Sequence, residues 1–406
     1  MADARSRRVA DEPGRAVAKS LSGNPAASAP VMAVDNWSMF RGCPRLTGVT
    51  SEPLPENLVV QWKFQTDERE PVTSTAAIVE GTVYVGCENG ILYALKLDDG
   101  KPIWSYKTKE SAAIKSSPTV IDNLVLFGDE GGEMHAIEAA TGKKMWVFKA
   151  EGEIVSSPNL DGDRIVFGSY DGCIYCLSIA DGKLLWKFTT EAQVHGTVGI
   201  ADGVAVVGGC DGKVRVLQLS DGKEIRSAAV GAQTAASTAL FGDRVFLGTL
   251  GNQVLCINWR TGEPVWTYEN PDRAFPFHAS AAATSDMVVI GGRDKSVHGI
   301  DPATGKLKWT HRAMGRVDSS PVIVLEVLTV GDSTKPPKAN HRDSARDRVF
   351  VGSGDGHLYG LELRTGKVVW DYESGSAFSA SPAVGGGRLV IGDEDGTVYC
   401  FGAKKK

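Results

Sequence analysis

Short apolar runs recur along the chain at a regular interval and end at a glycine. The clearest copies are Tyr84-Val85-Gly86, Val166-Phe167-Gly168 and Val390-Ile391-Gly392, each followed after a polar turn by a second apolar run. The eight copies end at Gly86, Gly128, Gly168, Gly208, Gly248, Gly291, Gly352 and Gly392. A period of about 40 residues is typical of solenoids and propellers, so the pattern indicates a repeat protein.

One repeat contains four strand patterns. In the third copy we expect strands over residues 156–161, 164–168, 173–178 and 183–188, with Asp-Gly turns at Gly162, Gly172 and Gly182. Short β-rich runs joined by Asp-Gly are the signal of β-hairpins. Four antiparallel strands per repeat describe a propeller blade. The sequence therefore predicts an all-β protein with a single eight-bladed β-propeller.

The last repeat lacks its fourth strand. It stops at Phe401, whereas Leu58 to Phe64 carries the missing outer-strand pattern ahead of the first repeat. We expect this N-terminal strand to complete the last blade, because closure removes open sheet edges. A tryptophan marks most outer strands, and Arg226 replaces it in the fourth repeat. These tryptophans are Trp62, Trp104, Trp146, Trp186, Trp266, Trp309 and Trp370.

The flanks and one insertion differ from the repeats. Residues 1–36 are rich in Ala, Ser, Pro and Arg, which predicts a disordered leader. A lead-in segment at 37–57 precedes the propeller at 58–402, and a basic tail at 403–406 follows it. Gly291 and Gly352 lie 61 residues apart, which places an insertion at about 322–348 between two strands. Such a loop is a candidate contact surface.

Composition and charge limit the class of partner and the compartment that we expect. The net charge of −5 and the pI of about 5.9 argue against nucleic acid. We expect no transmembrane segment, because no stretch of 18 apolar residues exists. No signal peptide or lipobox is recognisable, which favours the cytoplasm by default, or the periplasm if the true start differs. We expect a monomer. Of its seven cysteines, Cys176, Cys256 and Cys400 occupy equivalent strand positions and are interpreted as small buried residues. Cys173 and Cys176 point to opposite faces of one strand, which disfavours a metal or redox pair.

Alignment of the eight inner strands separates constant from divergent positions. One position always carries a hydroxyl, which we expect to bond backbone groups around the axis: Thr75, Ser117, Ser157, Thr197, Ser237, Ser280, Ser320 and Ser381. Two residues earlier the chain diverges, and Lys115, His195, His278 and Asp318 there predict a polar site at the channel mouth for an acidic or amphipathic ligand. The alternative is a hydrated mouth without a ligand.

The residue before each divergent position is mostly apolar, and Phe277 and Phe378 are its aromatic members. A rim of apolar side chains beside polar ones suits peptide docking. We therefore include both phenylalanines in the candidate site. No nucleophile elbow, zinc motif, paired carboxylates or calcium loop occurs, so we predict no catalytic residue and no metal site.

The phrase Asp-Gly-x-x-Tyr-x-Leu, followed by Thr-Gly-Lys-x-x-Trp and Ser-Ser-Pro, resembles the pyrroloquinoline quinone (PQQ)-type propeller repeat over residues 58–402. The segment from Trp37 to Gly42, with Gly48-Val49, resembles the lead-in common before such propellers. The resemblance implies eight blades, in agreement with the repeat count.

The resemblance leaves two functional classes open. Quinoprotein dehydrogenases of this family carry adjacent cysteines, calcium ligands and a catalytic aspartate, and none of these maps onto this sequence. The BamB-like branch binds proteins without chemistry, and its compact size is similar. We therefore expect a scaffold with a protein or peptide partner and no cofactor. The alternatives are a PQQ- and calcium-dependent dehydrogenase and a small-ligand sensor at the channel mouth.

Overall fold

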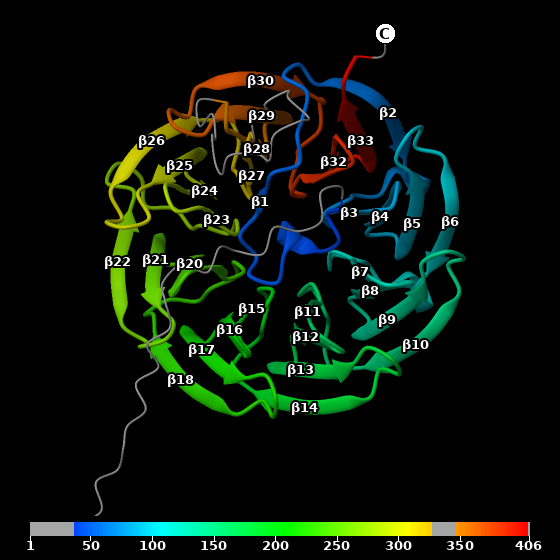
Figure 1. The fold of residues 1–406 in the computed structure, drawn as a ribbon, viewed down its shortest axis with the longest axis horizontal. Coiled ribbons are helices and arrows are strands. Elements are labelled where there is room, and N and C mark those ends of the chain that lie inside the picture. The colour runs from blue at the N-terminus through cyan, green and yellow to red at the C-terminus, as the bar shows by residue number, and fades with distance from the viewer. Residues whose placement is uncertain (1–35, 327–345, 405–406) are drawn as a thin grey trace, which may run out of the picture. The chain divides into compact units, whose positions relative to one another are not determined.

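A computed structural model describes residues 36–326 and 346–404 of the chain. In this part, eight four-stranded antiparallel blades surround a common axis, and three short 3-10 helices are the only helical elements (Figure 1). The predicted all-β, eight-bladed propeller is thus confirmed. Blade 7 carries one additional strand, β1 (Val49–Thr50), which pairs in parallel with its innermost strand.

The strands of each blade follow one another from the axis outward. Blades 1 to 4 consist of β3 (Ala77–Val79), β4 (Thr82–Gly86), β5 (Ile91–Lys96), β6 (Pro102–Lys107); β7 (Thr119–Ile121), β8 (Leu124–Gly128), β9 (Glu133–Glu138), β10 (Lys144–Lys149); β11 (Asn159–Asp161), β12 (Arg164–Gly168), β13 (Cys173–Ser178), β14 (Leu184–Thr189); β15 (Gly199–Ala201), β16 (Val204–Gly208), β17 (Lys213–Gln218) and β18 (Glu224–Ala229).

Blades 5 to 8 consist of β19 (Ala239–Phe241), β20 (Arg244–Gly248), β21 (Gln253–Asn258), β22 (Pro264–Glu269); β23 (Ala282–Ala283), β24 (Val288–Gly292), β25 (Ser296–Ile300), β26 (Leu307–Arg312); β27 (Val322–Val324), β28 (Arg348–Gly352), β29 (His357–Glu362), β30 (Val368–Glu373); β31 (Ala383–Gly385), β32 (Arg388–Gly392), β33 (Thr397–Gly402) and β2 (Val59–Gln65). The 3-10 helices are η1 (Phe40–Gly42), η2 (Asp67–Arg69) and η3 (Lys109–Ser111).

The N-terminal strand closes the ring as predicted. β2 pairs antiparallel with β33, from Val59 opposite Gly402 to Gln65 opposite Thr397. The Trp62 ring is 7% exposed, and its indole N–H donates to the Leu97 carbonyl of blade 1 at 2.7 Å. The other outer-strand tryptophans make the same bond to the next blade. In blade 4, Arg226 donates to Thr261 instead.

The repeat glycines allow neighbouring blades to touch. A Cβ atom on Gly86 would lie 2.4 Å from the Ile114 side chain of blade 2, and one on Gly168 would lie 2.3 Å from Val194 of blade 4. Each of the other six repeat glycines is crowded in the same way by a residue from the next blade. The glycine recurs because only a hydrogen fits at this contact.

The hydroxyl positions form a hydrogen-bonded ring around the axis. The backbone N–H of Ser117 donates to the Ser157 hydroxyl at 3.0 Å, and the N–H of Ser157 donates to Thr197 at 3.1 Å. The same bond is made at seven of the eight steps between blades among the described residues. The predicted backbone-bonding role is confirmed.

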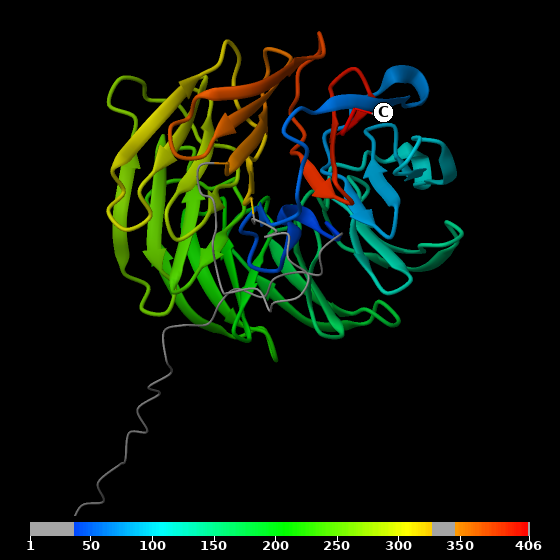
Figure 2. The same ribbon diagram turned by 45° about the horizontal axis from the view of Figure 1, so that its top comes forward.

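Residues 37–52, here called the plug, lie inside the ring (Figures 1 and 2). Plug carbonyls accept the backbone N–H groups of inner strands in six blades, from Ile78, Val120, Ile200, Leu240, Ala283 and Ile323. In blade 3 the Asn159 side-chain amide donates to the Pro44 carbonyl of the plug. In blade 8 the Gly387 N–H donates to the Glu52 carboxylate at 2.7 Å. The plug therefore accepts at least one hydrogen bond from every blade.

The predicted insertion falls between β27 and β28, and residues 327–345 lie outside the described residues. The predicted leader, up to residue 35, and the end of the basic tail, residues 405–406, also lie outside them. Within the residues that are described, no helix is long and apolar enough to span a membrane.

Candidate functional site

Two rings of divergent residues meet at one end of the propeller, which we call the channel mouth. The mouth ring precedes the inner strands and consists of Thr73, Lys115, Val155, His195, Ala235, His278, Asp318 and Ser379. The plug bonds residues that lie at least three positions further along the chain, from Ala281 onward in blade 6, so it does not contact the mouth ring through these bonds. The mouth ring is therefore separate from the residues that bond the plug.

The second ring, the turn ring, was missed by the sequence analysis. Its members stand two residues after each repeat glycine: Glu88, Glu130, Tyr170, Cys210, Leu250, Arg293, Gly354 and Glu394. Each donates its backbone N–H to a carbonyl two residues before the mouth ring, at 2.8 to 3.1 Å. Divergence between otherwise similar repeats, which located the mouth ring, also marks these positions and could have located the turn ring.

Lys115 lies beside the turn ring of its own blade. Its ammonium group contacts the Glu130 carboxylate at 2.7 Å, and both side chains are about one-third exposed. This hydrogen bond raises the pKa of Lys115. Lys115 is therefore a charged member of an ion pair and not a candidate base.

His195 faces Tyr170 from the neighbouring blade. The Tyr170 hydroxyl and the His195 Nδ1 atom are 2.5 Å apart. Burial lowers the pKa of His195, and the positive charges of His278 and Lys115 lower it further. The structure thus places His195 beside a tyrosine of blade 3 that the sequence analysis did not single out.

Asp318 is held by two arginines. Arg293 of blade 6 donates to both carboxylate oxygens, at 2.9 and 3.1 Å, and the Arg316 Nε atom lies 3.2 Å away. Burial lowers the pKa of the adjacent His278, with Arg293 as the next cause. Bidentate pairing of this kind fixes orientation as well as charge.

The expected apolar rim is wrong. Phe277 and Phe378 are each 1% exposed and pack inside inter-blade cores. Their Cβ atoms lie against the repeat glycines Gly248 and Gly352, where Ile114 and Val194 lie in other blades. These two residues belong to blade packing because the glycine contact draws them inward, so they offer no surface to a partner.

In each of six blades, a buried or half-buried aspartate carboxylate pairs with a side-chain donor. Tyr175, Tyr359 and Tyr399 donate to Asp171, Asp355 and Asp393 at 2.6 to 2.9 Å. Arg215, His135 and His298 take the tyrosine's place beside Asp211, Asp129 and Asp294. The donor always stands seven residues after the repeat glycine, whereas the carboxylate stands one or three residues after it. The recurrent donor position indicates a structural bond that serves the blade turn.

One of these pairs also has the donors for a metal. Asp129, Glu133 and His135 place one ligand atom each within 4.8 Å of one another. Asp129 Oδ1 accepts the Glu133 N–H at 2.8 Å, and Oδ2 lies 2.8 Å from His135. Because the carboxylate is already engaged as in the other blades, we interpret this group as the same structural bond.

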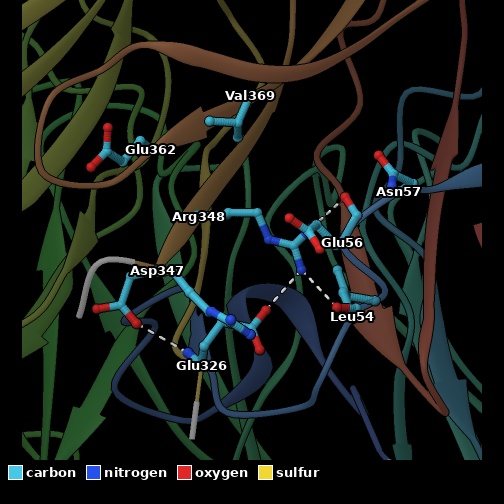
Figure 3. Close-up of a pocket in the computed structure, with 9 residues that line it drawn as sticks. Leu54, Glu56, Asn57, Glu326, Asp347, Arg348, Glu362 and Val369 are labelled. Atoms are coloured by element: carbon cyan, nitrogen blue, oxygen red, sulfur yellow. Dashed lines mark hydrogen bonds and ion pairs between the residues drawn. The ribbon is translucent and has the colours of Figure 1, made fainter. Parts of the chain in front are cut away.

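A cavity of about 280 Å³ lies at the base of the predicted insertion. Figure 3 shows Arg348 directed from blade 7 toward Leu54 and Glu56 of the segment that precedes β2. Its guanidinium donates to the carbonyls of Leu54, Pro55 and Glu56 and to the Glu326 carboxylate. Arg348, which is 7% exposed, therefore ties two parts of the chain together.

Comparison of the sequence with known protein families identifies the family of this chain. The family model described as outer membrane protein assembly factor BamB (PQQ_2) matches residues 52–126, 109–243, 230–336 and 331–405. The chain belongs to this PQQ_2 family. The resemblance seen in the repeats is thereby confirmed.

Relatives of this PQQ_2 chain fall into both functional classes. It is 30% identical to BamB of Burkholderia pseudomallei over 42% of the chain, and 25% identical to a quinohemoprotein alcohol dehydrogenase of Pseudomonas putida over 33%. The matches span 36% and 25% of those proteins. The crystal structure of BamB from Moraxella catarrhalis has the same fold, with a TM-score of 0.66, 16% identity, and coverage of 86% of this chain and 100% of that one.

The mouth does not fit a quinone held with calcium. A calcium site needs several oxygen ligands. Of the four carboxylates in the two rings, Glu130 pairs with Lys115, Asp318 with Arg293 and Arg316, and Glu394 lies 3.8 Å from Arg316, while Glu88 accepts a hydrogen bond from Thr73. The two rings contain no asparagine or glutamine. No reaction step through such a group is derived from these residues.

Proposed function

We propose that this chain is a non-catalytic scaffold that binds a protein or peptide partner through its channel mouth. The observation that carries the proposal is the organisation of the mouth into ion pairs between neighbouring elements, with Lys115 on Glu130 and Asp318 between Arg293 and Arg316. Such a surface presents fixed charges for recognition. The family model named for BamB supports the same class of function.

The second candidate is a quinoprotein dehydrogenase, favoured by the relative from Pseudomonas putida. The third is a small-ligand sensor that uses His195 and His278. Both need a small molecule at the mouth, whereas a scaffold needs a macromolecule there.

The test combines two measurements on the full chain. A photo-reactive amino acid is placed at Tyr170 in the mouth or, as a control, at Met145, which is 53% exposed on the outer strand β10. We expect a discrete protein adduct in the native cell from position 170 and none from position 145. PQQ and calcium are then added to purified protein, and dye-linked alcohol oxidation is followed. Saturable quinone binding with turnover would overturn the scaffold.

A further inference from the structure

Two exposed apolar side chains lie apart from the others. Among the described residues, thirteen large apolar side chains are more than one-third exposed, and eleven of them belong to outermost strands. The remaining two are Phe275, 47% exposed, and Met314, 77% exposed. They occupy consecutive loops, one leading into blade 6 and the next into blade 7, at the channel mouth.

The same two loops carry the arginine pair. Arg293 donates its backbone N–H to the carbonyl of Pro276, the residue after Phe275, at 3.0 Å. Its guanidinium then reaches Asp318 in the Met314 loop. The ion pair therefore links the two loops that present the exposed apolar residues.

The Met314 loop is held in place by backbone bonds. The N–H groups of Met314 and Gly315 donate to the Asp355 carboxylate at 2.7 and 3.3 Å, and Gly354 donates to the Arg316 carbonyl at 2.8 Å. A side chain on a fixed loop loses little entropy when a partner covers it. The exposure of Met314 is therefore a property of an ordered surface.

Charge indicates what covers this surface. Arg293 and Arg316 are 37% and 56% exposed, whereas the Asp318 carboxylate that they share is 17% exposed. Glu394 lies 3.8 Å from Arg316 on one side, so the guanidinium groups are the more accessible charges of this surface. Aromatic residues, Met and Arg are enriched where proteins bind one another. Glu88 and Glu130 stand elsewhere on the same turn ring, so the accessible positive groups are confined to this part of the mouth. A short acidic segment fits such a confined area better than an extended polyphosphate chain or an anionic membrane surface.

We propose that Phe275, Arg293, Met314 and Arg316 form a docking patch for an acidic, amphipathic peptide segment of a partner protein. Carboxylates of the segment bind the two guanidinium groups, and its apolar side chains cover Phe275 and Met314. The patch rests on the proposed scaffold function and specifies the chemistry of its partner.

The test uses fluorescence anisotropy with the full chain and a short fluorescein-labelled peptide of alternating glutamate and leucine. We expect saturable binding that weakens with salt, since the pairing is partly electrostatic. Arg316→Glu should weaken binding about tenfold, the equivalent of about 1.4 kcal/mol, and Phe275→Ser and Met314→Ser several-fold. All three side chains are exposed, so unfolding midpoints should match the wild type.

Matched controls lie away from the mouth. Arg364→Glu, in the exposed turn between β29 and β30, makes the same charge change, and Met145→Ser removes another exposed methionine, on the outer strand β10. Both should bind like the wild type. Equal binding of a lysine–leucine peptide, or unchanged binding by all patch variants, would overturn the proposal.

Failure of the patch and failure of the scaffold are distinguishable. If the adduct from position 170 persists in Arg316→Glu and in Phe275→Ser, the scaffold stands and the patch is wrong. Quinone turnover by the wild type would reject the scaffold whatever the peptide result.

Discussion

At the scale of single residues, each repeat glycine contacts a side chain of the next blade, which is β-branched in six blades and phenylalanine in two. We predict that Gly86→Ala destabilises the protein by about 1–3 kcal/mol, because the new methyl meets the Ile114 side chain at 2.4 Å. Urea unfolding measures the change. Ile114→Ala alone should also destabilise, by loss of a buried side chain.

The double variant Gly86→Ala/Ile114→Ala is the control for this contact. Its loss of unfolding free energy should be smaller than the sum of the losses in the two single variants, because the truncated side chain leaves room for the new methyl group. Strict additivity of the free energies would show that the two positions do not oppose each other.

The hydroxyl ring supports a second prediction. Ser157→Ala should cost about 1–3 kcal/mol of unfolding free energy, because the buried N–H of Ser117 loses its acceptor. Ser157→Thr should be milder, since Thr75 and Thr197 occupy the same position in other blades. Thermal unfolding of both variants checks this order, and equal losses would argue against the hydrogen bond as the cause.

At the scale of elements, β2 closes the ring through one aromatic anchor. Trp62→Ala should cost about 3–5 kcal/mol, as expected for a large buried aromatic side chain, and should speed hydrogen exchange of the β2 and β33 amides. Val59→Ala, at the exposed first position of the same strand, should change stability little. If exchange of β33 is unchanged in Trp62→Ala, the indole is not the closing contact.

At the scale of the whole molecule, the mouth couples stability to pH. Burial lowers the pKa values of His195 and His278 below their usual 6.5, so below that pH the unfolded chain binds protons that the folded chain does not. The free energy of unfolding should therefore fall as the pH drops from about 7.5 toward about 5.

The pH prediction is checked by urea unfolding of the wild type and of His195→Gln/His278→Gln across this range. The double variant should lose less stability on acidification than the wild type. Part of the slope should remain, because burial also lowers the pKa of His311. If the free energy of unfolding falls with pH equally in both proteins, His195 and His278 do not cause the pH dependence.

Sequence spacing predicted the blades well because each blade is built from contiguous residues. In the third repeat the strands expected at 164–168 and 173–178 appear with those bounds, and the fourth is displaced by one residue to Leu184–Thr189. The first strand is shorter than expected, Asn159–Asp161, because Ser156 and Ser157 bond neighbouring blades instead of a hairpin partner.

Sequence spacing predicted the candidate site less completely than the blades. Divergence located Lys115, His195, His278 and Asp318, but gave no means of seeing that Glu130, Tyr170 and Arg293 face them. The direction of Phe277 and Phe378 was also misjudged, because an alignment shows which position is apolar but not which glycine of the previous blade it fills.

The sequence by itself determined the number of blades, the closing strand and the ring of hydroxyl groups, since each follows from local periodicity repeated eight times. Only the tertiary structure decided the path of the plug, the pairing of Arg293 and Arg316 with Asp318, and the isolation of Phe275 and Met314 on one pair of loops. Those features depend on residues from different blades, and closure of the ring is what brings such residues together.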